Sequence, residues 1–182
     1  SGLAHAYKHA EKVKKQGHKY RQIYGCEFYF VPSLTQWKDD YEQAKIDRAL
    51  AKQKAIKDDA EGGHVIENED ETKTFELGKD EWKRRYHLVV TAQNREGLGN
   101  LFTLIKRAYT DGFYYLPRID RKIVETYKQD LIVLSGNLHG EVPSKVLNVG
   151  EKQAEEALLW WKAQFGEDFF IEIMRHNQED ED

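Results

Sequence analysis

The sequence has one cysteine in 182 residues and no long hydrophobic run. Cys26 has no second cysteine to pair with, so an internal disulfide is excluded and a reducing, cytoplasmic compartment is favoured. No stretch approaches the roughly 20 consecutive apolar residues that cross a bilayer. We therefore expect no membrane contact. The first 15 residues are polar with a helical pattern, which is not typical of a signal peptide.

The sequence also lacks a strong excess of charge of either sign. It has 28 Lys and Arg against 32 Asp and Glu, a formal net charge of −4. A chain with this balance does not attract nucleic acid as a whole. Any contact with DNA would have to be local or made by other parts of a larger protein.

Compact catalytic signatures are missing as well. Gly97 and Gly99 lie within an expected helix, not at a strand-to-helix turn, so they do not form a phosphate-binding loop. There is no HExxH or CxxC spacing and no internal repeat. The length suits one domain or a large part of one.

Apolar periodicity predicts helices alternating with strands, the pattern of an α/β protein with a parallel sheet. The run at 86–92 is almost continuously apolar, which predicts a strand covered on both faces. The helix after Asn94 should pack through Leu98, Leu101, Phe102, Ile105 and Ala108. The expected helices are one ended by Gly17, 37–59, one from Asn94 to Gly112, 120–127, and one between Gly150 and Gly166; the expected strands are 24–31, 86–92, 131–134 and 169–174.

The segment 37–84 is predicted to be an insertion between core strands. Its first part is a mostly polar helix of which only a thin stripe can pack. Residues 58–81 are dense in acidic groups, and alternation at 64–67 and 72–77 predicts a small hairpin or a mobile loop. Its charge is expected to be solvated.

Four segments at the ends of apolar runs carry groups that could face one metal site. Glu27 lies between apolar neighbours in a strand, where a carboxylate is costly unless it is paired or bound to a cation. A salt bridge to Lys or Arg is the alternative. His87, His139 and His176 each stand at a strand end, where an ordinary surface or hydrogen-bonded histidine is the alternative. His139 could also approach a bound phosphate.

Glutamate and imidazole together suit Zn²⁺, Mn²⁺ or Fe²⁺. Two or three such ions, held about 3.5–4 Å apart, could activate water and hold a phosphate in line. The spacings between these residues are long and irregular, so spacing alone leaves the metal site and the ordinary alternatives open.

At these segments the sequence resembles the PHP domain (polymerase and histidinol phosphatase) of bacterial DNA polymerase III α subunits. The blocks occur in the family's order and cover most of the chain outside 37–84. They are GCEFY at 25–29, YHLVVTAQN at 86–94, GLGNL at 97–101, AY at 108–109, PRID at 117–120, LIVLSGNLHGEV at 131–142 and FFIEIMRH at 169–176.

The resemblance implies a distorted (βα)₇ barrel, here partial and with a charged insertion, whose metal cluster lies at the strand ends. Glu27, His87 and His176 fall on metal-ligand positions of the family, with Zn²⁺ or Mn²⁺ as the expected metal. Asn137 stands where metal-binding members have cysteine, and a carboxamide is a far poorer ligand for soft metals than a thiolate.

The resemblance also implies that residues 1–182 are one PHP domain fragment. The family's opening H-x-H and D-H motifs would precede Ser1, and its closing D-x-H would follow Asp182. No catalytic residue can be assigned from the sequence.

The function implied is that of a segment of a replicative DNA polymerase α subunit, bacterial or phage-like. Such a parent copies DNA with Mg²⁺ and works with a sliding clamp, and the sequence contains no paired-carboxylate palm motif of its own. The PHP segment would act either as a metal-dependent 3′→5′ exonuclease or as a degenerate scaffold that docks an exonuclease subunit. The alternatives are a stand-alone phosphoesterase of the histidinol-phosphatase type and a metal-free protein-binding module.

Overall fold

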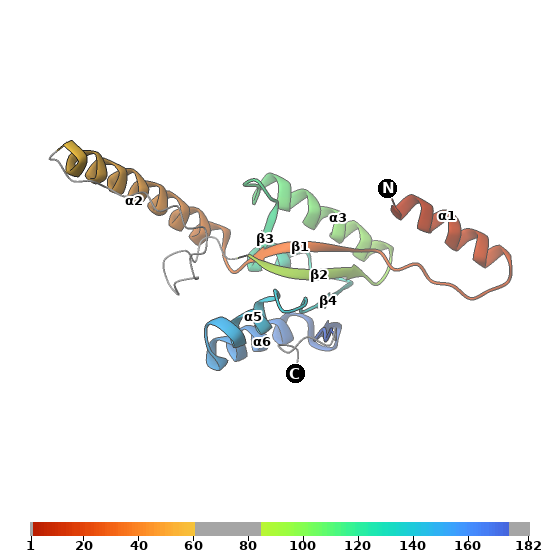
Figure 1. Cartoon of the computed structure of the whole chain (residues 1–182). Coiled ribbons are helices and arrows are strands. Elements are labelled where there is room, and N and C mark those ends of the chain that lie inside the picture. Colours follow the sequence, from red (N-terminus) through yellow and green to blue (C-terminus); the bar gives the residue numbers. More distant parts are fainter. Residues whose placement is uncertain (1, 61–84, 175–182) are drawn as a thin grey trace.

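The computed structural model describes residues 2–60 and 85–174, in which helices and strands alternate (Figure 1). Most of the expected elements are present. Strand β3 (Arg118–Asp120) and helix α5 (Glu141–Asn148) were not expected, and the last strand ends at Phe170, well short of the predicted residue 174. The elements are α1 (Gly2–Lys15), β1 (Gly25–Val31), α2 (Leu34–Ala60), β2 (Tyr86–Ala92), α3 (Arg95–Thr110), β3 (Arg118–Asp120), α4 (Arg121–Tyr127), β4 (Leu131–Leu134), α5 (Glu141–Asn148), α6 (Glu151–Phe165), the 3₁₀ turn η2 (Gly166–Asp168) and β5 (Phe169–Phe170).

The five described strands form a mixed sheet in the order β3-β1-β2-β4-β5. The prediction of a parallel sheet is wrong for β2, which runs antiparallel to both neighbours. Phe30 pairs with Tyr86, so the chain leaves β1 and enters β2 at the same end of the sheet. A connection of that kind joins antiparallel strands, whereas a parallel pair needs a crossover. Among the described strands the sheet is open, with β3 and β5 at its edges.

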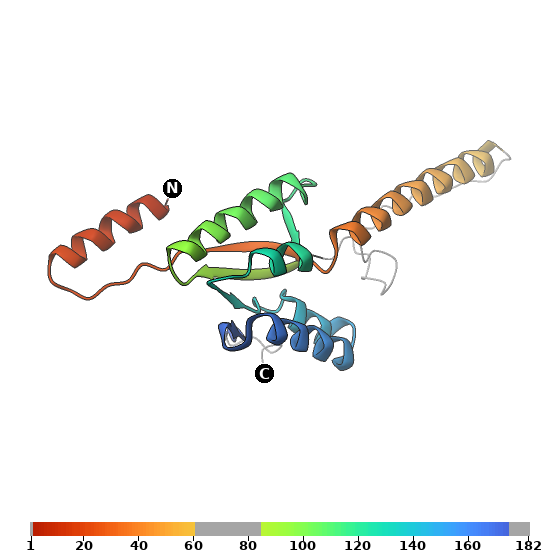
Figure 2. The same cartoon turned by 180° about the vertical axis from the view of Figure 1, so that it is seen from behind.

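One face of the sheet carries the hydrophobic core. Alternate residues of β1, β2 and β4 point into it, and helices α3, α4 and α6 contribute the other half. Figure 2 shows α4 in front of the strands, on the side turned away from the viewer in Figure 1. The buried core residues are Phe28, Phe30, Tyr86, Leu88, Val90, Leu101, Leu104, Ala108, Ile119, Val124, Leu131, Val133, Trp161 and Phe165.

The opposite face of the sheet, here called the open face, is only partly covered. In β2 the side chains alternate between buried and half-buried, so the prediction of a strand covered on both faces is wrong. Phe102 was also expected in the core, but its side chain is 58% exposed because it lies on the outer side of α3. The open face displays Glu27, Tyr29 and His87.

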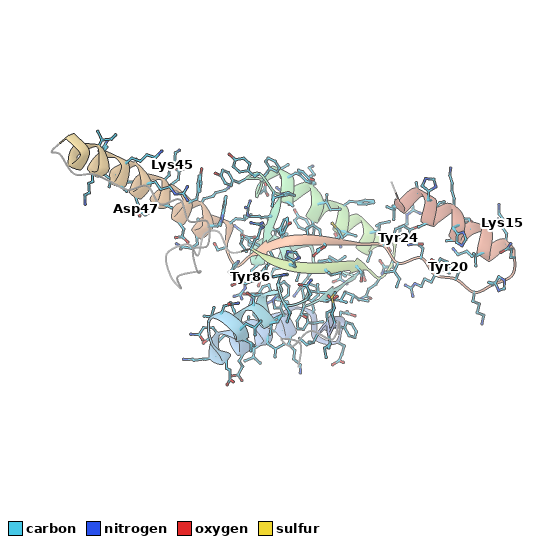
Figure 3. The ribbon with its side chains drawn as sticks, viewed as in Figure 1. Lys15, Tyr20, Tyr24, Lys45, Asp47 and Tyr86 are labelled. Carbon is cyan, nitrogen blue, oxygen red and sulfur yellow. The ribbon has the colours of Figure 1, made fainter. Side chains whose placement is uncertain are left out.

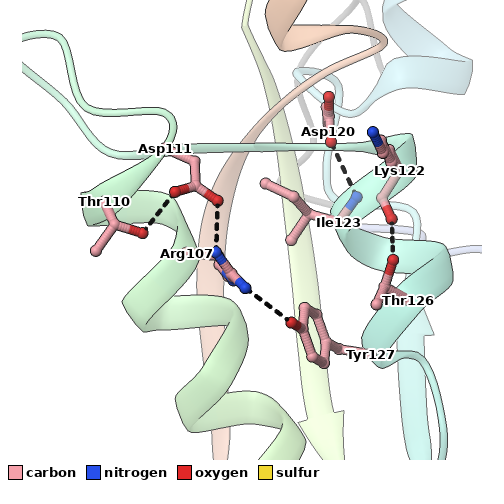
Figure 4. Close-up of polar contacts among 8 residues, drawn as sticks. All are labelled: Arg107, Thr110, Asp111, Asp120, Lys122, Ile123, Thr126 and Tyr127. Atoms are coloured by element: carbon pink, nitrogen blue, oxygen red, sulfur yellow. Dashed lines mark hydrogen bonds and ion pairs between the residues drawn. The ribbon is translucent and has the colours of Figure 1, made fainter.

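The base of α2 covers one end of the open face. Val31, Leu34 and Trp37 form a second buried cluster there. Asp120 fixes this base, since its Oδ2 accepts a hydrogen bond from the Leu34 amide at 3.0 Å. Its Oδ1 accepts from the Ile123 amide at 2.9 Å and caps α4 (Figure 4).

Helices α3 and α4 are joined by side chains as well as by the core. Arg107 donates one hydrogen bond to Asp111 within its own helix end and another to the hydroxyl of Tyr127 in α4, as Figure 4 shows. These contacts fix the layer that supports the sheet from behind.

Helices α1 and α2 project from opposite ends of the sheet. In Figure 3, Lys45 and Asp47 lie on α2 well away from the sheet, and Lys15 lies at the far end of α1. The base of α2 packs through Leu34 and Trp37, whereas the sequence predicted a thin packing stripe along the helix. The predicted hairpin at 64–67 and 72–77 lies outside the described residues.

Candidate metal centre

The site is built around a contact between Glu27 and His87 on the open face. The Nδ1 of His87 lies 2.6 Å from Oε1 of Glu27. In the antiparallel register Glu27 faces Val89 and His87 faces Tyr29, so the two are diagonal neighbours that long side chains can join. The sequence predicted that these residues would meet, but at the ends of parallel strands; the antiparallel pairing is what brings them together.

Glu27 has a histidine as its partner instead of the Lys or Arg that a simple salt bridge would supply. Its side chain is 58% exposed and that of His87 is 29% exposed, so the pair is accessible from solvent. An N–H at Nδ1 donating to the carboxylate would leave Nε2 of His87 with a free lone pair. Outer carboxylates orient metal-binding histidines in this way.

The loop at 135–140 brings His139 beside this pair. The His87 amide donates to the His139 carbonyl oxygen at 2.9 Å, and the two imidazole rings are 5.4 Å apart between centroids. The ring of Tyr29 approaches His87 from the other side, edge-on at 5.4 Å. His139 is exposed, so the surface alternative and a role toward a bound anion both remain compatible with its position.

Asn137 is engaged in shaping the loop. Its Oδ1 accepts a hydrogen bond from the His139 amide at 2.9 Å, and its carbonyl oxygen accepts from the Gly140 amide at 2.8 Å. Gly136 has a φ of +76°, and a Cβ on Gly140 would overlap the Ser135 carbonyl oxygen. The carboxamide oxygen, the one atom of this side chain that could bind a hard cation, thus already accepts a backbone hydrogen bond.

Glu172 is a half-buried acidic group that the sequence did not single out as a ligand. Its amide donates to Ser135 Oγ at 3.0 Å, next to the 135–140 loop. Its Oε2 is buried and has no hydrogen-bond partner in the described part of the chain. The signal for it was present, since Glu172 lies in the FFIEIMRH block.

Two further ionisable groups border the site without belonging to it. Cys26 points toward the core, where burial raises the pKa of its thiol and the neighbouring Glu27 carboxylate raises it further. Arg118 is almost fully buried at the other end of the open face. Burial lowers the pKa of its guanidinium, and the positive charge of Arg85 lowers it further.

The chemistry of the described donors does not fit a complete metal centre. In residues 2–60 and 85–174, no group of three or more His, Cys, Asp or Glu side chains is arranged to hold a metal ion. Catalytic zinc sites use three protein ligands and structural ones four. The structure brings Glu27 and His87 together. The side chain of Asn137 is hydrogen-bonded within its own loop. His176 lies outside the described residues.

Comparison with known families identifies the family of this chain. The family model described as PHP domain matches residues 1–176. The chain belongs to the PHP domain family. The resemblance noted from the sequence blocks is therefore confirmed, whereas closure of this PHP domain into a (βα)₇ barrel is not shown by its open sheet.

Similar relatives of this PHP domain are DNA polymerase III α subunits. The one from Borreliella burgdorferi is 40% identical over 100 residues, covering 55% of this chain and 9% of the relative. The one from Chlamydia trachomatis is 42% identical over 95 residues, covering 52% and 8%. The one from Deinococcus radiodurans is 39% identical over 98 residues, covering 54% and 7%. The chain thus spans less than a tenth of the length of these relatives.

The helices of this PHP domain agree with the lack of long apolar runs in its sequence. In residues 2–60 and 85–174, none is both long and apolar enough to cross a bilayer.

Proposed function

We propose that this PHP domain is a segment of a replicative DNA polymerase α subunit. Its role there is to support the polymerase and to dock an exonuclease subunit, not to hydrolyse DNA. The parent would extend primers from dNTPs with Mg²⁺, in the cytoplasm and together with a sliding clamp. The similarity to DNA polymerase III α subunits over half of the chain supports the parent's identity.

The observation that carries the docking role is the hydrogen bonding of the Asn137 side chain. This residue replaces the family's cysteine thiolate, and its oxygen accepts the His139 amide within a tight loop. A site that has exchanged a thiolate for a hydrogen-bonded carboxamide has lost affinity for soft metals. The 135–140 loop then serves the structure, tying β4 to the start of β2 through the His87 amide.

Metal-dependent 3′→5′ exonuclease activity is the second candidate, and one observation favours it. The 2.6 Å contact from Glu27 to Nδ1 of His87 is the arrangement in which a carboxylate orients an imidazole toward a metal. In that case the coordination shell of the Zn²⁺ or Mn²⁺ ion would need ligands in addition to Glu27 and His87, and His176 is the predicted one. The Oε2 of Glu172, which has no hydrogen-bond partner in the described part of the chain, would be a further ligand for a cation.

Metal content separates the two candidates. The full protein that carries this chain, purified without chelator and dialysed, is analysed for Zn and Mn by inductively coupled plasma mass spectrometry. With a docking role, we expect well under one Zn or Mn per chain attributable to this domain. The Glu27→Ala and His87→Ala variants should then match the parent protein.

The control is Glu96→Ala, which removes an equally exposed glutamate from the first turn of α3. One or more metal ions per chain that disappear in Glu27→Ala but persist in Glu96→Ala would refute the docking proposal. The same result would establish Glu27 as part of a metal centre.

A further inference from the structure

We infer that a stripe of exposed basic residues along α2 binds the phosphate backbone of duplex DNA. This inference rests on the proposed function, because a replicative polymerase holds the duplex of primer and template. It goes beyond that function by giving a role to a helix that lies almost entirely within the segment 37–84, outside the family blocks.

The first observation is that α2 separates its charges by face. Four exposed basic residues lie within about 80° of one another around the helix axis, at 3.6 residues per turn, and are here called the basic stripe: Lys38, Lys45, Arg48 and Lys52. Figure 3 shows Lys45 and Asp47 on opposite sides of α2. The helix therefore presents a cationic face although it has six basic and six acidic residues.

The second observation is that the acidic residues of α2 do not cancel the basic stripe. Asp40 and Asp47, on the other side of the helix, each accept a hydrogen bond from the glutamine one turn earlier, at 2.7 and 2.9 Å. Lys45 lies 3.9 Å from Glu42, and both of these side chains are more than half exposed. Exposed pairs of this kind are weak, so a phosphate can replace Glu42 as the partner of Lys45.

The third observation is that the base of α2 is held firmly on the sheet. Trp37 is buried there, and the guanidinium carbon of Arg118 lies 4.6 Å from the centroid of its ring. The Tyr114 hydroxyl donates to the Tyr41 hydroxyl at 2.7 Å. From this base α2 continues unbroken through the rest of its 27 residues. The basic stripe is thus oriented before a partner arrives, which lowers the entropic cost of binding.

Duplex DNA fits the basic stripe better than a single strand does. The stripe is about 21 Å long at 1.5 Å per residue, and a duplex carries one negative charge for about every 1.7 Å of its axis. The major groove also admits an α-helix. Surfaces that bind single strands add aromatic rings on which bases stack, but α2 has no aromatic residue from Glu42 to Ala60.

A local contact of this kind is the one that the charge balance of the chain allows. With a formal net charge of −4, the chain as a whole does not attract DNA. Between Ala44 and Lys54, however, four basic residues stand against a single acidic one. This part of α2 projects away from the sheet, where a duplex can reach it (Figure 1).

The test is fluorescence anisotropy of a fluorescein-labelled 20-base-pair duplex titrated with the full chain at 50 mM salt in EDTA. We expect saturable binding that the triple variant Lys45→Gln/Arg48→Gln/Lys52→Gln weakens at least tenfold. The slope of log affinity against log salt should become less steep by about 2.7, because each phosphate contact to a duplex contributes about 0.9. Glutamine matches lysine and arginine in helix propensity, so the circular dichroism spectrum should not change.

Two lysines that are close in sequence supply the matched control. Lys52 lies in the basic stripe and Lys54 on the opposite side of α2, and both are exposed. Lys52→Gln should reduce the salt slope by about 0.9, whereas Lys54→Gln should leave it unchanged. Glu42→Gln should tighten binding severalfold, because it removes the acid beside Lys45. Equal losses in the two lysine variants, weaker binding by Glu42→Gln or no binding at 100 µM chain would overturn the inference.

Two further probes identify the partner. A 20-nucleotide strand of dT should bind at least threefold more weakly than the duplex, and polyglutamate at the same concentration of charge should compete poorly. A single strand that binds as well as the duplex, or polyglutamate that competes as well, would refute the assignment to duplex DNA. Primer extension by the full protein that carries this chain tests the proposed function separately. Intact primer extension together with equal binding by Lys52→Gln and Lys54→Gln would remove this inference alone.

Discussion

Replacing Glu141 with alanine is expected to lower the free energy of unfolding by about 3 kcal/mol, far more than the loss of an exposed carboxylate would. Glu141 is 2% exposed and joins three helices. Its Oε1 accepts from Arg121 in α4 at 2.9 Å and from Lys145 in α5 at 2.8 Å. Its Oε2 accepts from the indole Nε1 of Trp161 in α6 at 2.9 Å.

The reason for the large effect is what the substitution leaves behind. Arg121 stacks on Trp160 at 4.7 Å and already has a buried Nε without a partner in the described part of the chain. Without Glu141, its guanidinium and the Trp161 N–H would both lose their acceptor in a region of low dielectric. Arg121 and Lys145 remain 30% and 17% exposed, which places the effect at the lower end of the usual range for a broken buried pair.

Urea unfolding followed by tryptophan fluorescence and circular dichroism would measure this change. Glu155→Ala is the matched control, because Glu155 is exposed on α6 and should change stability by no more than about 0.5 kcal/mol. Glu141→Gln should fall between the two, since the amide keeps one acceptor oxygen. A midpoint for Glu141→Ala equal to that of Glu155→Ala would contradict this account of the network.

Two glycines of α3 should respond to alanine with opposite signs. Gly97 is buried, and a Cβ there would overlap the backbone carbonyl of Asp130, next to the start of β4. Backbone cannot rotate away as a side chain can, so we expect Gly97→Ala to destabilise the fold by about 3 kcal/mol. Gly99 lies on the exposed side of the same helix, where a Cβ would meet nothing within 4 Å.

Gly99→Ala should therefore stabilise the fold by about 0.5–1 kcal/mol, because alanine restricts the unfolded chain and favours helix. The two variants differ in composition by the same single methyl group, so each is the control for the other. Measured in the same urea titration, the two midpoints should lie on opposite sides of the parent's. Shifts of the same sign would show that α3 does not approach Asp130 as closely as described.

The sequence predicted those elements whose boundaries have a local cause. Asn94 caps α3 by accepting from the Gly97 amide, and Pro32 directly follows the last residue of β1. Helix α5 was missed because it has only eight residues, fewer than the window over which helical periodicity is recognised, and because it contains Pro143. The partners of its first residue Glu141, which are Arg121 and Trp161, are each 20 residues away in sequence, beyond the reach of periodicity.

Strand direction could not be read from the same patterns. A helix between two strands usually marks a crossover to a parallel strand. Here α2 leads away from the sheet, and β2 begins beside the end of β1, where Tyr86 pairs with Phe30. Phe102 was misplaced for a related reason: one helix has room for only one buried stripe, and Leu101, Leu104 and Ala108 occupy it.

The candidate site was predictable in part. The proximity of Glu27 and His87 followed from the family blocks, and the structure places them in contact. The sequence could not predict whether they hold a metal. That depends on the hydrogen bond that the Asn137 carboxamide accepts from the His139 amide, and on His176, which lies outside the described residues. Nothing in the sequence alone indicated that Arg85 lies over Tyr29.

A single primer-template assay with the full protein that carries this chain tests the central claim most directly. It follows dNTP incorporation and removal of the primer's 3′ nucleotide in the same reaction, for the parent protein and for the Glu27→Gln/His87→Ala double variant. The account predicts incorporation in both and the same rate of 3′ removal in both. No incorporation by the parent protein, or 3′ removal that vanishes in the double variant while incorporation continues, would contradict it.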